Sequence, residues 1–168
     1  MKKPKIELKN IKHHAGLSQE THAYTATIYV DGKKWATVEN TGQGGCDYVH
    51  PLSGYNDQEA VSELDKRIKA TYPKLMCKLF PDGLEERLES ICCGLVNEYL
   101  FTKDWRARLK RRIYAIKDNS IFEWSAKFKP TIEMLAKFKE KQPGYQWLNS
   151  MPEKEAFALI REAQGTIE

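Results

Sequence analysis

Alternation of apolar and polar residues predicts a pair of antiparallel strands near the start of the chain. Residues 5–12 alternate loosely, and residues 24–30 place tyrosine, alanine, isoleucine and valine side chains on one side. Asp31-Gly32 favours a tight hairpin turn after them, because these residue types adopt positive φ angles readily. We therefore expect a return strand over residues 35–39.

Apolar residues at helical spacing predict two helices after this hairpin. The first is expected over residues 57–72, with Asn56 and Glu59 forming a capping box at its start. The second is expected from residue 84 to about residue 109, because its apolar residues follow the 3.6-residue period closely. The spacing therefore predicts a helical middle of the chain.

A second hairpin is predicted after the long helix. Residues 112–117 and 121–128 are expected to pair around a turn at Asp118-Asn119. Aromatic and charged residues alternate on the return strand, so one face should be buried and the other solvated. We expect the aromatic side chains of this strand to belong to the core.

Three short elements complete the predicted fold. Pro130-Thr131 is expected to open a helix, and residues 145–149 a short strand. Ser150 with Glu153 is typical of a capping box before a last helix. The predicted order is therefore β-β-β-α-α-β-β-α-β-α.

This order predicts an α+β fold in which helices pack on one side of antiparallel β-hairpins. We expect a single domain over residues 1–168, with possible lobes at residues 1–56 and 57–168. The first lobe would hold the hairpin and a glycine-rich loop, and the second the helices and the second hairpin. A chain of 168 residues is long enough to bury a core without disulfides or metals.

Composition adds an expected location. No apolar run approaches the ~20 residues that cross a bilayer, and strand-like sequence follows the basic start. We therefore expect a cytoplasmic protein that does not contact the membrane. In that compartment all cysteines should be reduced thiols, and three of them should fill the core: Cys77, Cys92 and Cys93.

The loop from Gly42 to His50 is the first candidate site. Its glycines could turn backbone N–H groups toward an anion, although the endings of known phosphate loops are absent. Cys46, Asp47 and His50 could form a nucleophile with its base, because a thiol needs an imidazole nearby to react. A turn that lets the strand leave the sheet is the alternative that we favour.

Histidines suggest a second candidate, a metal site. All four histidines lie in the first third of the chain, and the first hairpin could bring His13 or His14 near His22. With Cys46 and His50 they could supply the four nitrogen or sulfur ligands that zinc prefers. The paired spacing of known zinc sites is absent, so we expect no cofactor and keep zinc as an alternative.

Positive charge gathers in one segment, which is the third candidate. Residues 101–141 carry 12 basic and 5 acidic side chains, and Trp105 and Tyr114 lie among the basic ones. Such residues can neutralise phosphates, stack on bases or meet an acidic protein surface, but they can equally form a solvated face. The predicted binding residues are Lys103, Arg106, Arg108, Lys110, Arg111, Arg112 and Lys117.

Several stretches resemble small accessory proteins that bacteriophages and prophages carry. The likeness lies in residues 29–34, 42–47, 111–118, 143–144 and 148–152. It implies a bacterial cytosol during infection or lysogeny. It also implies a protein that binds and redirects host machinery, including CRISPR and other defence systems. No catalytic residue is implied by this resemblance.

Three functional hypotheses follow. The leading one is a phage or mobile-element protein that binds and inhibits or redirects a host or defence complex, such as CRISPR, without catalysis. The second is a nucleic-acid-binding protein that uses residues 103–117. The third is a small enzyme that uses the loop from Gly42 to His50. The sequence leaves the identity of the partner and the oligomeric state open.

Overall fold

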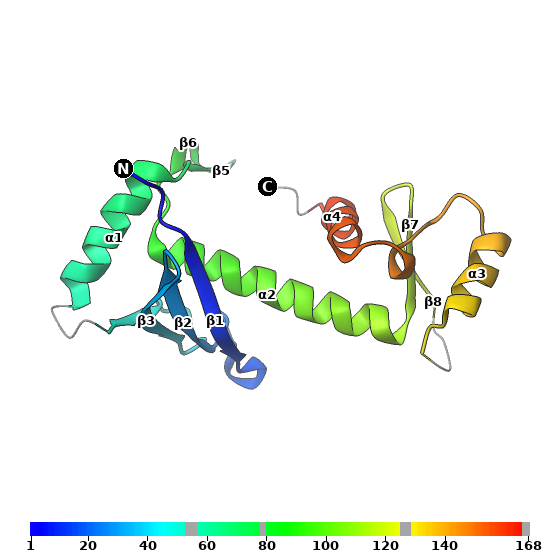
Figure 1. Ribbon diagram of the computed structural model, residues 1–168, viewed down its shortest axis with the longest axis horizontal. Coiled ribbons are helices and arrows are strands. Elements are labelled where there is room, and N and C mark those ends of the chain that lie inside the picture. The colour runs from blue at the N-terminus through cyan, green and yellow to red at the C-terminus, as the bar shows by residue number, and fades with distance from the viewer. Residues whose placement is uncertain (53–56, 78–79, 125–128, 166–168) are drawn as a thin grey trace. The chain divides into compact units, whose positions relative to one another are not determined.

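The computed structural model describes residues 1–52, 57–77, 80–124 and 129–165 (Figure 1). It confirms an α+β fold with four helices and antiparallel sheets in the described part of the chain. The chain forms two compact units, unit 1 (Met1–Glu98) and unit 2 (Tyr99–Glu168). The long helix α2 begins in unit 1 and ends in unit 2.

Unit 1 is built on a four-stranded antiparallel sheet with strand order β1-β2-β3-β4. Its elements are β1 (Ile6–His13), η1 (Ala15–Leu17), β2 (Tyr24–Val30), β3 (Lys33–Asn40), β4 (Tyr48–Pro51), α1 (Asp57–Thr71), β5 (Leu75–Cys77), β6 (Phe80–Leu84) and the start of α2 (Leu88–Arg111). The first hairpin is confirmed, because Asp31 and Gly32 have φ angles of 51° and 81°.

One face of this sheet is buried. Alternate residues of β2 are buried along its whole length, as the apolar pattern predicted. The helices contribute the buried residues Leu64, Ile68, Leu88, Cys92 and Val96. Cys92 is thus a core residue, but Cys93 is exposed, since the next position of a helix lies about 100° around its axis. The side chain of Cys77 lies outside the described residues.

Three strands of unit 1 were not predicted. β4 pairs with β3 although residues 48–51 belong to the segment expected to be a loop. β5 and β6 form a small hairpin before the long helix, and β6 ends at Leu84, where that helix was expected to begin. That helix begins at Leu88, whose N–H donates to Asp65 Oδ1 at 2.7 Å. Asn56 of the predicted capping box lies outside the described residues.

Unit 2 is built on a three-stranded antiparallel sheet with strand order β8-β7-β9. Its elements are the end of α2, β7 (Ile113–Lys117), β8 (Ser120–Trp124), α3 (Ile132–Lys141), β9 (Gln146–Trp147), η2 (Leu148–Ser150) and α4 (Glu153–Ala163). The predicted turn is confirmed by positive φ angles at Asp118 and Asn119. Residues 125–128 of the predicted return strand lie outside the described residues.

Helices cover both faces of the sheet in unit 2, because β7 is buried on both sides. Tyr114 and Ile116 pack with residues of α2 and α4. Ile113 and Ala115 pack on the other face with Leu135 of α3. The predicted packing of helices on one side of a sheet therefore fits unit 1, whereas the sheet of unit 2 has helices on both sides.

Two details of unit 2 differ from expectation. The side chain of Ser150 donates to Trp147 O instead of capping α4, which starts after Pro152. Phe122 of β8 is 38% exposed, although the alternation placed it in the core. The helix expected to open at Pro130-Thr131 is confirmed, and the Thr131 hydroxyl caps it by accepting the N–H of Met134.

Candidate functional site

The glycine-rich loop is organised by the side chain of Asn40, which is 9% exposed. Its Oδ1 accepts hydrogen bonds from Thr21 Oγ1 at 2.9 Å and from Gly42 N at 2.8 Å. Its Nδ2 donates to Gly45 O at 3.1 Å and to Asp47 Oδ1 at 2.9 Å. Both donor and both acceptor positions of the amide group are therefore used, three of them by the loop and one by Thr21.

Gly42 has a structural role in the same loop. Its φ is +84°, and an added Cβ would lie 2.4 Å from Leu17 O and 2.8 Å from Ala23 Cβ. Its carbonyl accepts the N–H groups of Gln19 and Glu20 at 2.9 and 3.0 Å. The Gly42 N–H itself binds an asparagine side chain, so it is not directed at an anion. The geometry supports the turn interpretation over the phosphate interpretation.

The structure gives Cys46 and His50 different partners. Cys46 is exposed, and a hydrogen bond to the Glu89 carboxylate raises the pKa of its thiol. The Nε2 atom of His50 lies 3.7 Å from Glu39 Oε1 across the sheet. A raised thiol pKa is the opposite of what a cysteine nucleophile needs. The geometry therefore does not favour the enzyme hypothesis.

Asp47, within the loop, has a half-buried side chain. Tyr24 donates its hydroxyl to Asp47 Oδ2 at 2.6 Å, and the Asp47 N–H donates to Glu89 Oε1 at 3.3 Å. Burial raises the pKa of the Asp47 carboxyl, and the nearby Glu89 adds to this, while hydrogen bonds from Tyr24 and Asn40 act in the opposite direction. Asp47 thus fixes the loop to the sheet and to α2.

The histidines come together only in part. The rings of His13 and His22 lie 5.3 Å apart, as the hairpin predicted, and Ser18 Oγ lies 3.2 Å from His13 Nε2. Across the described ranges, no group of three or more histidine, cysteine or acidic residues is placed to hold a metal ion. His14, Cys46 and His50 thus do not complete a zinc site with this pair.

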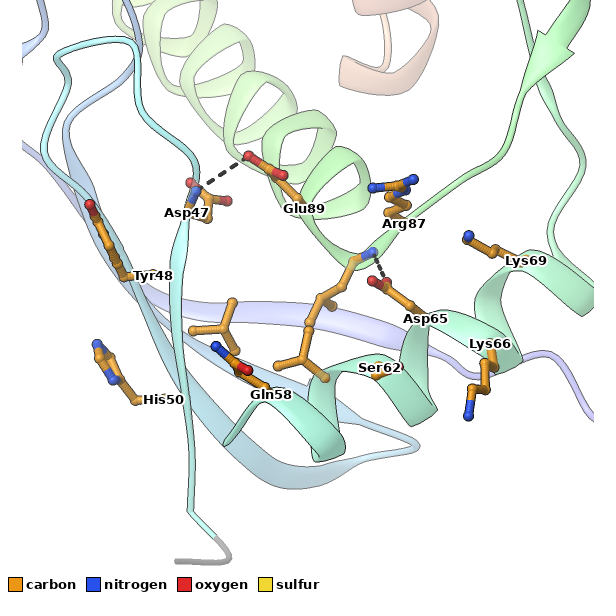
Figure 2. Close-up of a pocket in the computed structure, with 13 residues that line it drawn as sticks. Asp47, Tyr48, His50, Gln58, Ser62, Asp65, Lys66, Lys69, Arg87 and Glu89 are labelled. Carbon is orange, nitrogen blue, oxygen red and sulfur yellow. Dashed lines mark hydrogen bonds between the residues drawn. The ribbon is translucent and has the colours of Figure 1, made fainter. Parts of the chain in front are cut away.

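Described residues of unit 1 line a groove beside β4 with a volume of about 800 Å³ (Figure 2). We call it the β4 groove. One wall is β4 with Asp47, and the opposite wall is α1, from Gln58 to Lys69. The first residues of α2 close one end. The side chains around it are Asp47, Tyr48, Val49, His50, Gln58, Val61, Ser62, Asp65, Lys66, Lys69, Arg87, Leu88 and Glu89.

The free edge of β4 faces this groove. β4 is the last strand of its sheet, and the Leu52 N–H, just after β4, donates to Trp35 O of β3 at 2.9 Å. In an antiparallel pair, successive residues direct their backbone groups to opposite sides. The N–H and C=O of Val49 therefore point away from β3. The Asp47 N–H, which has the same direction, reaches Glu89 at the end of the groove.

Acidic and basic residues of the groove are used differently. Asp65 and Glu89 accept backbone N–H groups, from Leu88 and Asp47 respectively. Lys66 and Lys69 form only solvent-exposed ion pairs, with partners 3.6 and 3.1 Å away. Such pairs contribute little because water screens them. The acids are thus part of the framework, while the lysines can exchange partners.

Arg87 is the clearest case of an available cation. Its side chain is exposed at the end of the groove, and in the described part of the chain no carboxylate is paired with its guanidinium. Figure 2 shows Arg87 and Lys69 on the same side of the groove. A guanidinium is suited to binding a carboxylate through two hydrogen bonds. The sequence did not indicate this position, because a single arginine before a helix has no distinctive pattern.

The basic segment of unit 2 is largely paired within itself. Arg106 makes a two-pronged contact to Glu153, at 2.8 and 2.5 Å, and Arg108 Nε lies 2.7 Å from Asp104 Oδ2. Arg112 pairs with Glu123. Three of the seven predicted binding residues therefore have acidic partners.

The other predicted residues are more available. Lys103 lies over the ring of Tyr99 and Lys117 over the ring of Tyr145, at 5.7 and 5.2 Å. Lys110 and Arg111 are exposed and have no ion-pair partner among the described residues. The aromatic residues expected to stack on bases are not available, because Trp105 and Tyr114 are 4% and 3% exposed and pack on each other.

A different aromatic group in unit 2 is partly exposed. Phe122 and Tyr145 contact each other with ring centroids 5.3 Å apart, and Trp124 contacts both. Lys117 lies beside Tyr145 at one end of this group. The alternation on β8 identified these rings as apolar but did not show which of them α3 would leave uncovered.

Comparison with protein-family models, with curated proteins and with solved structures found no match to this chain. Among the described residues, no helix has the length and apolar character needed to span a bilayer. The site must therefore be interpreted from its own geometry.

Proposed function

We propose that this protein is a binding protein without catalytic activity, which acts by docking on a partner protein. In keeping with the resemblance to phage and prophage accessory proteins, the partner would be a host or defence complex in the bacterial cytosol, such as a CRISPR complex. Docking would inhibit or redirect that complex.

The β4 groove is the observation that supports this proposal. It combines a strand edge that no other described strand pairs with, apolar lining residues at Val61 and Leu88, and charged walls. A strand edge offers main-chain hydrogen bonds to another chain, and apolar pockets beside it accept side chains. Catalysis has less support, since the thiol of Cys46 has a raised pKa.

A pull-down from nuclease-treated bacterial lysate tests the proposal with matched variants. Ser62 is exposed and lines the groove, so Ser62→Trp should fill it without disturbing the core. Ala70 is an exposed residue of the same helix outside the groove, and Ala70→Trp is the control. We expect proteins that the wild type and Ala70→Trp recover to be lost with Ser62→Trp. Equal recovery by all three would contradict docking at the groove.

Nucleic-acid binding by unit 2 is the second candidate, because charge is unequal between the units. Residues 99–168 carry 14 Lys and Arg against 9 Asp and Glu, whereas residues 1–98 carry 13 against 14. Lys110 and Arg111 are exposed at the end of α2, and Lys117 adjoins the exposed aromatic group.

Salt dependence distinguishes this candidate. Binding of a labelled single strand should weaken steeply with added salt, since released counterions drive phosphate contacts. Lys110→Glu with Arg111→Glu should lower the affinity and reduce the salt slope. Affinity that does not change with salt would exclude phosphate contacts.

A further inference from the structure

We infer that the β4 groove binds an extended segment of the partner polypeptide, which adds a strand to the edge of β4 and places an acidic side chain on Arg87. This inference rests on the proposed function, because it names the chemistry of the segment that the groove would hold. It is argued from the backbone directions of β4 and from the charges around the groove.

The backbone of β4 favours an extended occupant. The N–H and C=O of Val49 both point away from β3, so one residue of an added strand can exchange two hydrogen bonds with it. A helix has already satisfied its own backbone groups and would leave those of Val49 unpaired. An extended segment is the form of polypeptide that uses this edge.

Residues at both ends limit how far the added strand can pair. Pro51 is buried and has no N–H, so an added strand can receive no hydrogen bond from it. At the other end, the Asp47 N–H is already bound by Glu89. Pairing is thus centred on Val49. A short segment with one defined register fits these limits.

The walls of the groove determine which side chains fit. Successive side chains of an added strand point to opposite faces. One set would face α1, where Val61 and the buried Leu88 provide apolar contacts. The other set would lie on the side of Tyr48 and His50, which are exposed. A segment that alternates apolar and polar residues matches this arrangement.

Charge complementarity selects an acidic residue. Three cations line the α1 and α2 side of the groove, Lys66, Lys69 and Arg87. The acids on that side, Asp65 and Glu89, each accept a backbone N–H, and among the described residues neither is paired with Arg87. A carboxylate from the partner would therefore meet an unpaired guanidinium with two lysines nearby.

Small anions fit the groove less well than an acidic peptide. The Leu88 N–H, at the start of α2, binds Asp65, and the Arg87 N–H binds Ser90 Oγ at 2.9 Å. These two N–H groups at the start of α2 therefore already have acceptors and are not available to an anion. Inorganic phosphate offers no apolar side chains to Val61 and no backbone to Val49. Phosphate is therefore the appropriate competitor in the test.

Selection from a display library of short random peptides on the full-length protein tests this inference. We expect selected peptides to be rich in Asp and Glu, and to bind the wild type and Ala70→Trp but not Ser62→Trp. Methylating the backbone nitrogen opposite Val49 should weaken binding about tenfold or more, since it removes a strand-pairing bond. Arg87→Glu should weaken acidic peptides by a similar factor, and a Glu→Lys change in the peptide should restore the loss. Millimolar phosphate should not displace them.

The outcomes separate the inference from the proposed function. Peptides that depend on Ser62 but lack acidic residues, or that tolerate methylation at every position, would overturn the inference while leaving polypeptide binding at the groove. Peptides that bind Ser62→Trp as well as the wild type would overturn both. Displacement by phosphate would show that the cations bind anions alone and would overturn strand addition.

Discussion

The β4 groove of unit 1 and the basic segment of unit 2 use their charged side chains in opposite ways. In unit 1 the carboxylates bind backbone N–H groups, as Asp65 does at the start of α2, and the nearby lysines have only exposed partners. In the basic segment of unit 2, three of the four arginines are held by carboxylates, as Arg106 is by Glu153. The unit with net charge −1 therefore has the more available cations in its groove, and the unit with net charge +5 has several that are paired.

This difference shows why a count of charges does not locate a binding surface. The sequence directed attention to residues 103–117, where positive charge is dense. Ion pairs within the fold make part of that charge less available to a binding partner, because a paired arginine must lose one carboxylate to gain another. An isolated cation such as Arg87 has no such cost. The comparison can be tested by changing the groups that hold each unit together.

Each unit contains an asparagine whose side chain holds irregular backbone in place, and no sequence pattern indicated either residue. Asn40 holds the loop of unit 1. Asn149 has the same role in unit 2, where its Nδ2 donates to Leu109 O and Arg112 O at 2.7 and 2.8 Å. Its Oδ1 accepts the Tyr114 N–H at 2.7 Å. Each amide satisfies backbone groups that irregular chain leaves unpaired.

The largest predicted effect is that of Asn40→Ala. It removes four hydrogen bonds around a buried position and leaves the Asp47 carboxylate without one of its donors. We expect the free energy of unfolding to fall by about 3 kcal/mol. Hydrogen exchange should rise over residues 13–47 and stay unchanged in unit 2. Thr21→Val, which removes the hydroxyl donor, should cost about 1 kcal/mol. An equal rise of hydrogen exchange in both units would contradict the view that Asn40 stabilises only the loop of unit 1.

Asn149→Ala makes the matching change in unit 2. The side chain is only half-buried and makes three hydrogen bonds, so we expect a loss of about 2 kcal/mol, measured by urea unfolding. Asn149→Asp keeps the acceptor for Tyr114 but places a negative charge at the end of α2. Because the C-terminal end of a helix carries a partial negative charge that repels an added one, this variant should be no more stable than Asn149→Ala. Recovery of stability in Asn149→Asp would show that only the Tyr114 contact matters.

Much of the fold could be predicted because its longer elements carry periodic patterns. The first hairpin, both long helices and the hairpin of unit 2 all follow apolar periodicity and known turn residues. β4 was missed because four residues, one of them proline, show no alternation. The cap expected from Ser150 failed because a serine can serve any nearby carbonyl, and here it serves Trp147.

Less of the site could be predicted because it depends on contacts distant in sequence. Cys46 and His50 are close along the chain, but Glu89 and Glu39 determine their surroundings. The β4 groove arises where residues 47–50 approach α1 and the start of α2. No local pattern reports such an approach. Sequence spacing identified the pair His13 and His22 only because one hairpin joins them.

Lowering the pH should stabilise the folded state of unit 1 through protonation of Asp47. Burial raises the pKa of this carboxyl in the folded state, so the folded state binds the proton more tightly than the unfolded state. Its contribution to stability is therefore complete below the ordinary pKa of 3.8 and is lost as pH rises through the raised pKa. Relative to Asp47→Asn, the wild type should gain stability as pH falls from about 7 toward 4. Urea unfolding of both proteins across this range measures the difference. A constant difference would show that the Asp47 carboxyl is not perturbed.

Reversing the Arg106–Glu153 pair should have the smallest effect, because both side chains are about half exposed, at 54% and 51%. Arg106→Glu and Glu153→Arg should each lower the urea midpoint slightly, since each places like charges together. The double variant should restore the midpoint and leave the net charge of unit 2 unchanged. It therefore separates the two explanations of any nucleic-acid binding. If the single strand binds the double variant as well as the wild type, the overall field of unit 2 attracts it; if binding falls, Arg106 contacts the strand itself despite its partner.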